Sequence, residues 1–225
     1  MNKLIVIVLI VILYIFISKF GKFGKSAFKN NGFANIDAKY IMPIVFNNLI
    51  TPTEADYIIE TSKKSFKESK IISGLDSNIR KSKTTWLYKD DPIIYNIIKR
   101  ICDMNGFPIV NAEPLQVVQY EPGGYYNDHH DSCCDDDPKC TDFVQNGGQR
   151  ILTVLIYLND DFTGGATKFS TIGKEIKAPK YGGIVFRPVE NDSNKCHPLA
   201  LHKGMPVNSG IKYVCNIWIR ESEYS

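Results

Sequence analysis

Two segments in the first half of the chain carry the apolar spacing of amphipathic helices. Thr51, Pro52 and Glu54 form a helix-start signal, in which the threonine and glutamate side chains accept hydrogen bonds from backbone N–H groups of the first turn. This start predicts a helix that continues to about residue 67. In residues 91–104, isoleucines recur every three or four positions, which is the spacing of one buried helix face.

Beyond residue 113 the pattern changes to short apolar and β-branched runs separated by glycine-rich turns. Since no helical spacing lies between these runs, they predict an antiparallel barrel or sandwich with the earlier helices packed on one side. The fold class is therefore α+β and mainly β. The predicted strands are residues 115–120, 150–158, 167–169, 184–186 and 212–220.

The beginning of the chain has a different character. Residues 4–17 are apolar without interruption, and a lysine flanks the run on each side. A helix of this length spans about 21 Å, and snorkelling lysines extend its reach toward the ~30 Å of a bilayer core. We favour a signal-anchor transmembrane helix over residues 1–18, followed by a stalk over residues 19–40. A cleaved signal peptide, which lacks small residues at its cleavage positions, and a buried core helix, which would need a polar face, are the alternatives.

The charge of the chain is unevenly distributed. The formal net charge is +3, but five lysines lie before residue 30 and no acidic residue precedes Asp37. The remainder therefore carries a net charge of −2, and the excess of base belongs to the membrane segment rather than to a nucleic-acid-binding face. We expect a membrane as partner through the N-terminal helix, and we expect no nucleic acid.

The six cysteines of the chain help to indicate the cellular compartment of the protein. Cys133, Cys134 and Cys140 crowd one short acidic loop, as a disulfide clip in an oxidising lumen would, and a zinc site built from them is the alternative. Cys102 and Cys215 are interpreted as buried thiols. The lysines after the apolar run favour a cytoplasmic body. The cysteines favour a single-pass membrane protein with its body in the endoplasmic reticulum lumen, which we prefer.

Histidines and one carboxylate suggest a metal site. Residues two apart in an extended chain face the same side, so His129 and Asp131 can converge on one ion while His130 points away. His202 would complete a set of two histidines and one carboxylate, which leaves open positions on an octahedral ferrous ion. His197 is the competing second histidine, and a surface His-Asp hydrogen bond is the alternative to a metal site.

Lys212 lies ten residues after His202, at the start of the last predicted strand. A lysine buried in a barrel wall costs free energy unless an anion pairs with it, so this position implies a ligand carboxylate. A lysine that faces solvent is the alternative.

Further motifs surround these residues in a fixed order. They are Tyr120-Glu121-Pro122-Gly123, Tyr126, His129-x-Asp131, Gln149-Arg150, Tyr157-Leu158-Asn159, Gly164-Gly165-x-Thr167-x-Phe169, His202, Pro206-Val207, Gly210-x-Lys212-Tyr213, Asn216 and Trp218. As an ordered set they resemble the prolyl 4-hydroxylase family of iron- and 2-oxoglutarate-dependent oxygenases. The resemblance runs from about residue 41 to residue 220.

The resemblance implies a double-stranded β-helix (jelly-roll) core over residues 113–221 and a helical support region over residues 41–112. It identifies the catalytic iron ligands as His129, Asp131 and His202. It implies that Lys212 binds the distal carboxylate of 2-oxoglutarate and that Tyr120 and Thr167 assist. The residues implied at the substrate groove are Tyr126, Arg150 and Trp218, with ordinary core packing as the alternative for the two aromatic residues.

The activity implied by the resemblance is hydroxylation of peptidyl proline at C4, in a collagen-like or proline-rich protein. Fe(II), 2-oxoglutarate, O2 and L-ascorbate are the implied cofactors and cosubstrates, with succinate and CO2 as products. An oxygenase acting on another protein residue or a small molecule is the nearest alternative. A non-catalytic, membrane-tethered jelly-roll binding module and a zinc-bound structural domain are the alternatives from other classes.

Overall fold

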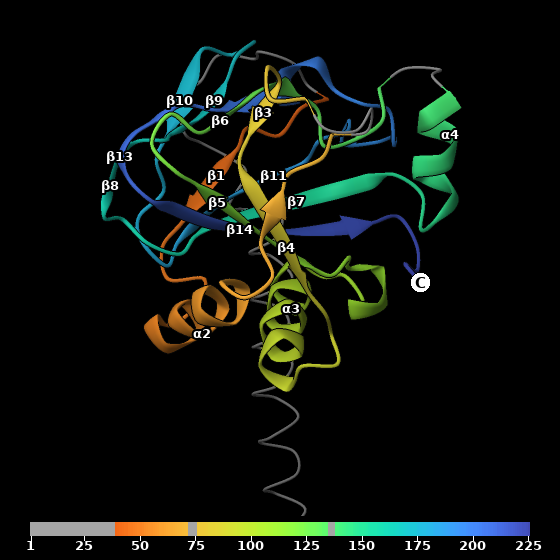
Figure 1. The fold of residues 1–225 in the computed structure, drawn as a ribbon. Coiled ribbons are helices and arrows are strands. Elements are labelled where there is room, and N and C mark those ends of the chain that lie inside the picture. The colour runs from red at the N-terminus through yellow and green to blue at the C-terminus, as the bar shows by residue number, and fades with distance from the viewer. Residues whose placement is uncertain (1–38, 72–75, 135–137) are drawn as a thin grey trace, which may run out of the picture. The chain divides into compact units, whose positions relative to one another are not determined.

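A computed structural model describes residues 39–71, 76–134 and 138–225 (Figure 1). The predicted anchor over residues 1–18 lies outside these residues, as does nearly all of the predicted stalk. Within the described part, no helix combines the length and the apolar character that crossing a membrane requires.

The larger sheet has seven strands, and each neighbouring pair in it is antiparallel. Its two longest strands lie side by side at the centre, where their apolar and β-branched residues are buried on both faces. In spatial order the strands are β1 (Ile44–Phe46), β11 (Gly183–Phe186), β7 (Arg150–Tyr157), β14 (Lys212–Arg220), β5 (Leu115–Tyr120), β4 (Lys83–Leu87) and β2 (Lys67–Glu68).

A smaller, five-stranded antiparallel sheet forms the second layer of the jelly roll. Its order is β10 (Lys174–Ile176), β9 (Thr167–Phe169), β12 (His202–Gly204), β6 (Tyr125–His129) and β3 (Arg80–Lys81). A two-stranded ribbon of β13 (Val207–Gly210) and β8 (Phe162–Gly164) lies apart from both sheets in the pairing pattern.

Helices α2 (Pro52–Ser62) and α3 (Pro92–Asn105) pack on one side of the larger sheet (Figure 1). Thr51 caps α2 as predicted, Asp91 caps α3, and Gly106 ends α3 in the left-handed conformation. The remaining helical elements are α4 (Pro138–Gln145) and the 3-10 turns η1 (Ile109–Asn111) and η2 (Pro198–Ala200).

Alternation along the strands of the larger sheet creates two cores. Val117 on β5 joins the cluster that includes the buried isoleucines of α3, whereas its neighbour Val118 joins the cluster with Phe169 of the smaller sheet. Successive side chains of a strand point to opposite faces, so one strand serves both layers. The observed fold is mainly β with antiparallel sheets and few helices, in agreement with the predicted jelly roll.

Two boundaries differ from the predictions. The first helix ends at Ser62, not near residue 67, because Lys67 pairs with Thr84 as part of the larger sheet. Strand pairing thus replaces the last predicted turn of helix. The region predicted as helical support also contains the short strands β1 to β4, whose two to five residues carry too little pattern to be recognised from the sequence.

Candidate active site

Two neighbouring strands bring the predicted metal-binding residues together. His129 ends β6, and His202 begins β12 directly opposite it in the antiparallel register. Asp131 follows β6 by two residues and is 7 % exposed. One donor atom from each of the three side chains lies within 4.8 Å of the others. The predicted convergence of these residues is therefore present in the structure.

Backbone carbonyls orient both imidazoles. His129 Nδ1 lies 2.8 Å from the carbonyl oxygen of Asn127, and His202 Nδ1 lies 2.9 Å from that of Ala200. A carbonyl oxygen only accepts, so each Nδ1 carries the hydrogen and each Nε2 keeps its lone pair. Both Nε2 atoms lie 3.9 Å from oxygens of Asp131, on the inner side of the cluster. This arrangement is typical of metal-binding histidines.

The protonation states also suit metal binding. Burial and the adjacent His202 lower the pKa of His129 to about 3, so this imidazole is neutral at neutral pH. Burial alone would raise the pKa of Asp131, but the imidazoles of His202 and His129 outweigh it and lower that pKa to about 2. Thr153 also donates a 2.7 Å hydrogen bond to Asp131 Oδ2. The cluster therefore offers two imidazole nitrogens and one carboxylate, a donor set that fits Fe(II).

The cluster opens into a cavity of about 340 Å³ between the two sheets. This volume is within the range of small-molecule sites. Lys212, Thr167, Arg150 and Trp218 all line this cavity, together with His129, Asp131 and His202. The cavity thus joins the predicted cosubstrate residues to the predicted substrate residues through the metal-binding cluster.

Lys212 is 2 % exposed, so the alternative of a solvent-facing lysine is wrong. Its Nζ donates to the carbonyl oxygen of Gly165 at 2.7 Å and lies 4.8 Å from the ring centroid of Tyr157 and 5.2 Å from that of Tyr120. Burial, with a smaller effect of Lys177, lowers the pKa of Lys212 to about 7. An anion bound next to Nζ would supply a counter-charge and would raise the pKa of Lys212, which favours the protonated amine.

Gly165 makes room for the Lys212 side chain. Its φ is +64°, and a Cβ at this position would lie 3.1 Å from Lys212 Cδ. Thr167, two residues later, is 2 % exposed and shares a 2.9 Å hydrogen bond with the hydroxyl of Tyr157. Tyr120 pairs directly with Lys212 in the β5–β14 register. The three residues predicted at the cosubstrate end therefore lie in one neighbourhood.

Arg150 is held in place by a buried carboxylate. Its Nε and one terminal nitrogen donate to the two oxygens of Glu113 at 2.6 and 2.7 Å, and Arg220 Nε donates to the same carboxylate at 2.6 Å. The guanidinium of Arg150 stacks 3.5 Å from the ring centroid of Trp218. Burial opposes ionisation of Glu113, but the two guanidiniums outweigh it and keep the pKa of Glu113 below its ordinary value.

Comparison with known proteins places this site in a family. The 2OG-Fe(II) oxygenase superfamily model matches residues 115–220. Over 193 residues the chain is 48% identical to a protein of Acanthamoeba polyphaga mimivirus named "Putative prolyl 4-hydroxylase", and the match covers 86% of this chain and 80% of that relative. The chain belongs to the prolyl 4-hydroxylase family. It is also 32% identical over 206 residues to prolyl 4-hydroxylase 5 of Arabidopsis thaliana, covering 80% of this chain and 69% of the relative.

Solved structures agree with this family assignment. The crystal structure of a viral collagen prolyl hydroxylase from Paramecium Bursaria Chlorella virus-1, in complex with 2OG, has a TM-score of 0.63 and 30% identity, and the match covers 83% of this chain and 99% of that one. A prolyl hydroxylase from Trichoplax adhaerens has a TM-score of 0.61 at 16% identity, which shows the shared fold; the match covers 83% of this chain and 86% of that one. As a member of the 2OG-Fe(II) oxygenases, the chain is an oxygenase, and its family implies Fe(II), 2-oxoglutarate and O2.

The other residues singled out in this prolyl 4-hydroxylase family member also have definite positions. Tyr126 stacks on His129, with 3.6 Å between ring centroids, and its ring lies 4.6 Å below the guanidinium of Arg80. His130 lies apart from the three-residue cluster, as strand alternation predicts. His197 is 2 % exposed, accepts a hydrogen bond from Leu199 N and stacks on a tyrosine. It is not part of the metal-binding cluster, so His202 is the histidine that faces Asp131.

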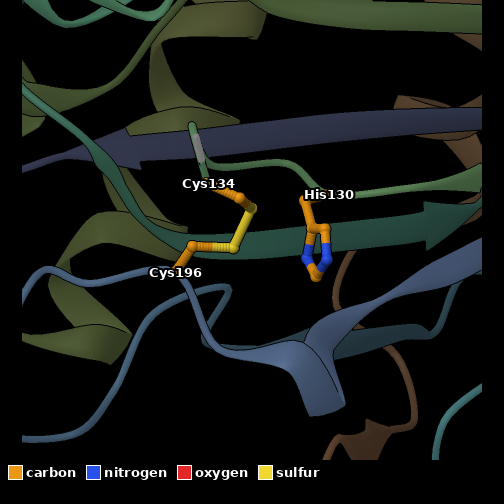
Figure 2. A group of neighbouring side chains, drawn as sticks. All are labelled: His130, Cys134 and Cys196. Carbon is orange, nitrogen blue, oxygen red and sulfur yellow. A yellow bond between two sulfur atoms is a disulfide. The ribbon is translucent and has the colours of Figure 1, made fainter. Parts of the chain in front are cut away.

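The cysteines form two disulfides, Cys133–Cys140 and Cys134–Cys196 (Figure 2 shows the second, beside His130). The predicted disulfide clip in the acidic loop is therefore present, but one of its bonds reaches out of that loop. The zinc site considered for Cys133, Cys134 and Cys140 is wrong, because all three sulfurs are in disulfides. Cys102 and Cys215 are buried free thiols, as predicted.

Two residues of the site, Glu113 and Arg80, were not predicted from the sequence. Glu113 precedes β5 as a single acidic residue, and no local pattern indicates that two distant arginines enclose it. Arg80 is 8 % exposed, lines the cavity and donates to Ser82 Oγ at 2.9 Å. The sequence gives no sign of Arg80 either, because residues 80–85 are all polar and show no alternation.

Proposed function

We propose that this chain is a prolyl 4-hydroxylase that uses Fe(II), 2-oxoglutarate and O2 to hydroxylate peptidyl proline at C4, releasing succinate and CO2. The observation that carries the proposal is that His129, Asp131 and His202 face the same cavity as the buried Lys212. Similarity to the mimivirus and chlorella-virus prolyl hydroxylases supports proline as the target. A procollagen-type substrate, collagen-like or proline-rich, is the finer part of this proposal.

The iron would be held by Nε2 of His129, Nε2 of His202 and the carboxylate of Asp131. When bound, it supplies the oxygen activation that no amino-acid side chain can perform. The chain holds the two imidazoles by their backbone hydrogen bonds and keeps Asp131 ionised, so the ligands need little rearrangement to bind the metal. L-ascorbate is proposed as the reductant that restores iron after uncoupled turnover.

Lys212, which lines the same cavity, would bind the distal carboxylate of 2-oxoglutarate, with Tyr120 and Thr167 nearby. The carboxylate would supply the missing counter-charge and favour the protonated amine. The aromatic rings around Nζ keep water away from the amine, which strengthens the charge pair. Lys212 thus orients the cosubstrate through charge, and the surrounding residues set the space it occupies.

Arg150, Trp218 and Tyr126, which line the cavity, would contact the peptide. Trp218 Nε1 is buried and has no hydrogen-bond partner among the described residues, although its ring lines the cavity. An unpaired N–H donor of this kind suits a peptide carbonyl oxygen. Glu113 would fix the orientation of Arg150 toward the peptide, because both oxygens of its carboxylate accept hydrogen bonds from the Arg150 guanidinium.

We further propose that residues 1–18 anchor the protein in the endoplasmic reticulum membrane with the body in the lumen. The two disulfides of the body support this placement, because disulfides persist in oxidising compartments. A cytoplasmic body would instead be expected to keep these cysteines reduced.

The test is a comparison of turnover with proline-rich and collagen-like peptides, with and without 2-oxoglutarate. A product heavier by one oxygen atom, formed only with 2-oxoglutarate, is expected for the parent, and His129→Ala, Asp131→Ala and His202→Ala should each abolish it. Asp128→Ala, on the same strand but exposed, is the matched control and should retain turnover. Near-normal turnover in any of the three ligand variants would overturn the ligand assignment. Hydroxylation of a matched peptide without proline would overturn the substrate assignment.

A further inference from the structure

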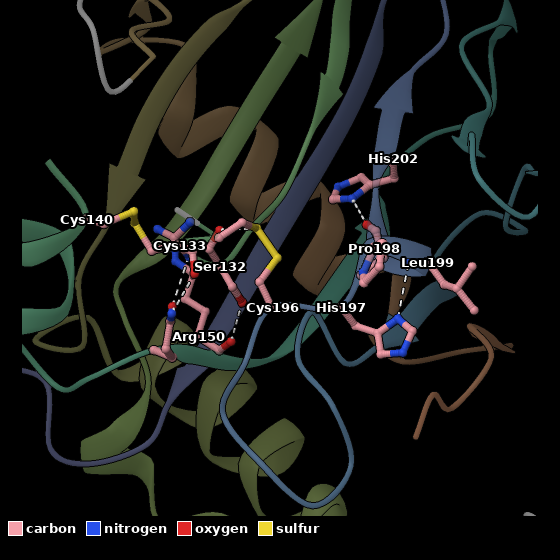
Figure 3. The surroundings of a disulfide bond; sticks show 12 residues. Ser132, Cys133, Cys140, Arg150, Cys196, His197, Pro198, Leu199 and His202 are labelled. Carbon is pink, nitrogen blue, oxygen red and sulfur yellow. Dashed lines mark hydrogen bonds between the residues drawn. A yellow bond between two sulfur atoms is a disulfide. The ribbon is translucent and has the colours of Figure 1, made fainter. Parts of the chain in front are cut away.

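One of the two disulfides connects the segments that carry the metal-binding residues. Cys134 follows Asp131 by three residues, and Cys196 precedes His202 by six. The bond Cys134–Cys196 joins them across a sequence separation of 62 residues, with 4.9 Å between the Cα atoms. Figure 3 shows this bond between the segment near Arg150 and the turn that leads to His202.

The strand pairing supplies the second connection between the same segments. His129 of β6 pairs with His202 of β12. The metal-binding cluster is therefore held on one side by backbone pairing and on the other by a covalent bond. Together these links close a short ring through Asp131 and His202, which limits how far the carboxylate and the imidazole can separate.

On the side of His202, a chain of backbone contacts follows Cys196. His197 N donates to Pro188 O, and Leu199 N donates to the His197 ring at 3.1 Å. The turn η2 then ends at Ala200, whose carbonyl oxygen accepts from His202 Nδ1 at 2.9 Å. Cys196 therefore connects to the His202 ring through a short segment whose residues are held by these hydrogen bonds, so a shift of Cys196 would change the orientation of that ring.

On the side of Asp131, the segment is attached to the start of β7. Ser132 Oγ donates to Arg150 O at 2.8 Å, and Cys133 exchanges two hydrogen bonds with the Gln149 side chain, at 2.9 and 2.7 Å. His130 lies beside the disulfide, with a ring nitrogen within 4.8 Å of both sulfurs, and its ring is drawn next to the bond in Figure 2. The disulfide is thus packed against the segment it holds.

We propose that Cys134 and Cys196 are positioning residues for the metal centre, because their disulfide sets the separation of Asp131 from His202 before the metal binds. This inference rests on the proposed ligand assignment. Cys133–Cys140 offers a matched contrast, because it closes a separation of only seven residues within one loop and does not connect the two ligand segments. Loss of the first bond should therefore weaken metal binding, whereas loss of the second should not.

The experiment measures Co(II) affinity of the metal-free protein by its absorption spectrum, for Cys134→Ser/Cys196→Ser and for Cys133→Ser/Cys140→Ser. We expect the dissociation constant to rise about tenfold for the first pair, the scale seen when groups that orient metal ligands are removed, and to change less than about twofold for the second. Thermal unfolding of both metal-free variants is measured alongside. A purely stabilising disulfide would lower the melting temperature and leave Co(II) affinity unchanged, and that result would overturn the proposal.

Two further measurements keep the outcome interpretable. His202→Ala should lose Co(II) binding with both disulfides intact; if it binds like the parent, the ligand assignment has failed and not the role of the disulfide. If the Cys134→Ser/Cys196→Ser variant does not fold, the parent is reduced with a phosphine, to which the exposed Cys134 is accessible. The Cys133→Ser/Cys140→Ser variant is reduced in the same way. The proposal is supported if both proteins bind Co(II) more weakly after reduction and recover their affinity on reoxidation. Unchanged binding after reduction overturns it.

Discussion

Lys212, which is buried, and Arg150, which is half-buried, are basic residues that line the same cavity, but their surroundings differ in charge. Both oxygens of Glu113 accept hydrogen bonds from Arg150. Lys212 contacts the carbonyl oxygen of Gly165 and two aromatic rings, and within the described part of the chain no carboxylate forms an ion pair with it. The protein itself neutralises one cation and leaves the other for a ligand.

This difference separates a positioning role from a binding role. A cation with a built-in counter-charge has a fixed orientation and gains little charge attraction from an arriving anion. A cation without one is costly in the empty protein and becomes favourable only when an anion binds. We therefore expect mutations at the Glu113–Arg150 end to affect folding first and mutations at the Lys212 end to affect 2-oxoglutarate first.

The largest effect is expected for Glu113→Gln. The substitution removes the negative charge that Arg150 and Arg220 share, and breaking a buried pair in this way costs about 3–5 kcal/mol of unfolding free energy. Urea denaturation measures the loss. Glu121→Gln is the control, since Glu121 pairs with Lys83 in an exposed position and should lose less than about 1 kcal/mol. Equal losses in the two variants would contradict the comparison.

The same variant has an acid-pH signature. Because the folded-state pKa of Glu113 lies below its ordinary value of 4.5, the unfolded protein binds more protons at acid pH. The stabilisation from Glu113 is present above pH 4.5 and is lost as the pH falls through the folded-state value. The gap in unfolding free energy between the parent and Glu113→Gln should therefore narrow as the solution is acidified, and a constant gap would contradict this origin.

Next in size is Lys212→Met, which keeps the length of the side chain and removes its charge. Loss of a charged hydrogen bond to the cosubstrate should weaken 2-oxoglutarate binding by about 100-fold, roughly 2.7 kcal/mol. Calorimetry with Mn(II) in place of iron measures the affinity. Lys168→Met is the control, because Lys168 is a strand lysine whose β9 neighbour Thr167 lines the cavity while Lys168 does not. The metal-free Lys212→Met protein should be at least as stable as the parent, and marked destabilisation would mean that the lysine is structural.

The pH dependence of Lys212 has the same sign as that of Glu113, but it falls in an alkaline range of pH. Its pKa in the empty protein is about 7 against an ordinary value of 10.5, so the unfolded protein binds more protons between these values. Unfolding free energy should therefore rise with pH from 7 toward 10.5 in the parent relative to Lys212→Met. Since 2-oxoglutarate needs the protonated amine, its affinity should fall about fivefold between pH 7 and pH 8. Parallel pH profiles for the two proteins would contradict this prediction.

The ligand-binding residues could be predicted from the sequence, whereas the residues that surround Arg150 could not. His129, Asp131, His202 and Lys212 were recognisable because strand alternation and the order of motifs are local or one-dimensional properties. The same holds for the buried face of α3 and for the two long central strands of the larger sheet. The structure contains these elements as predicted, because the secondary-structure preference of each segment and its packing favour the same conformation.

What the sequence did not reveal depends on contacts between distant segments. Glu113 lies 37 residues from Arg150 and 107 from Arg220, and a single acidic residue before a strand carries no sign of either partner. The bond Cys134–Cys196 was equally hidden, because spacing does not determine disulfide connectivity. Helix α2 stopped early for a related reason, since the pairing of β2 with β4 outweighed helix preference.

The smallest effect is expected for Thr167→Val, which tests how far the binding end extends beyond Lys212. Thr167 shares a hydrogen bond with Tyr157, whose hydroxyl also lies 3.4 Å from Ile176 O, so the tyrosine keeps one partner after the substitution. We expect 2-oxoglutarate affinity to fall about threefold, the scale of one neutral hydrogen bond, as measured by the same calorimetry. Thr163→Val is the control, because Thr163 bonds to Ser209 at an exposed position. Loss of stability with unchanged 2-oxoglutarate affinity would assign Thr167 to the support of Tyr157, and the binding end would then consist of Lys212 and its strand partner Tyr120.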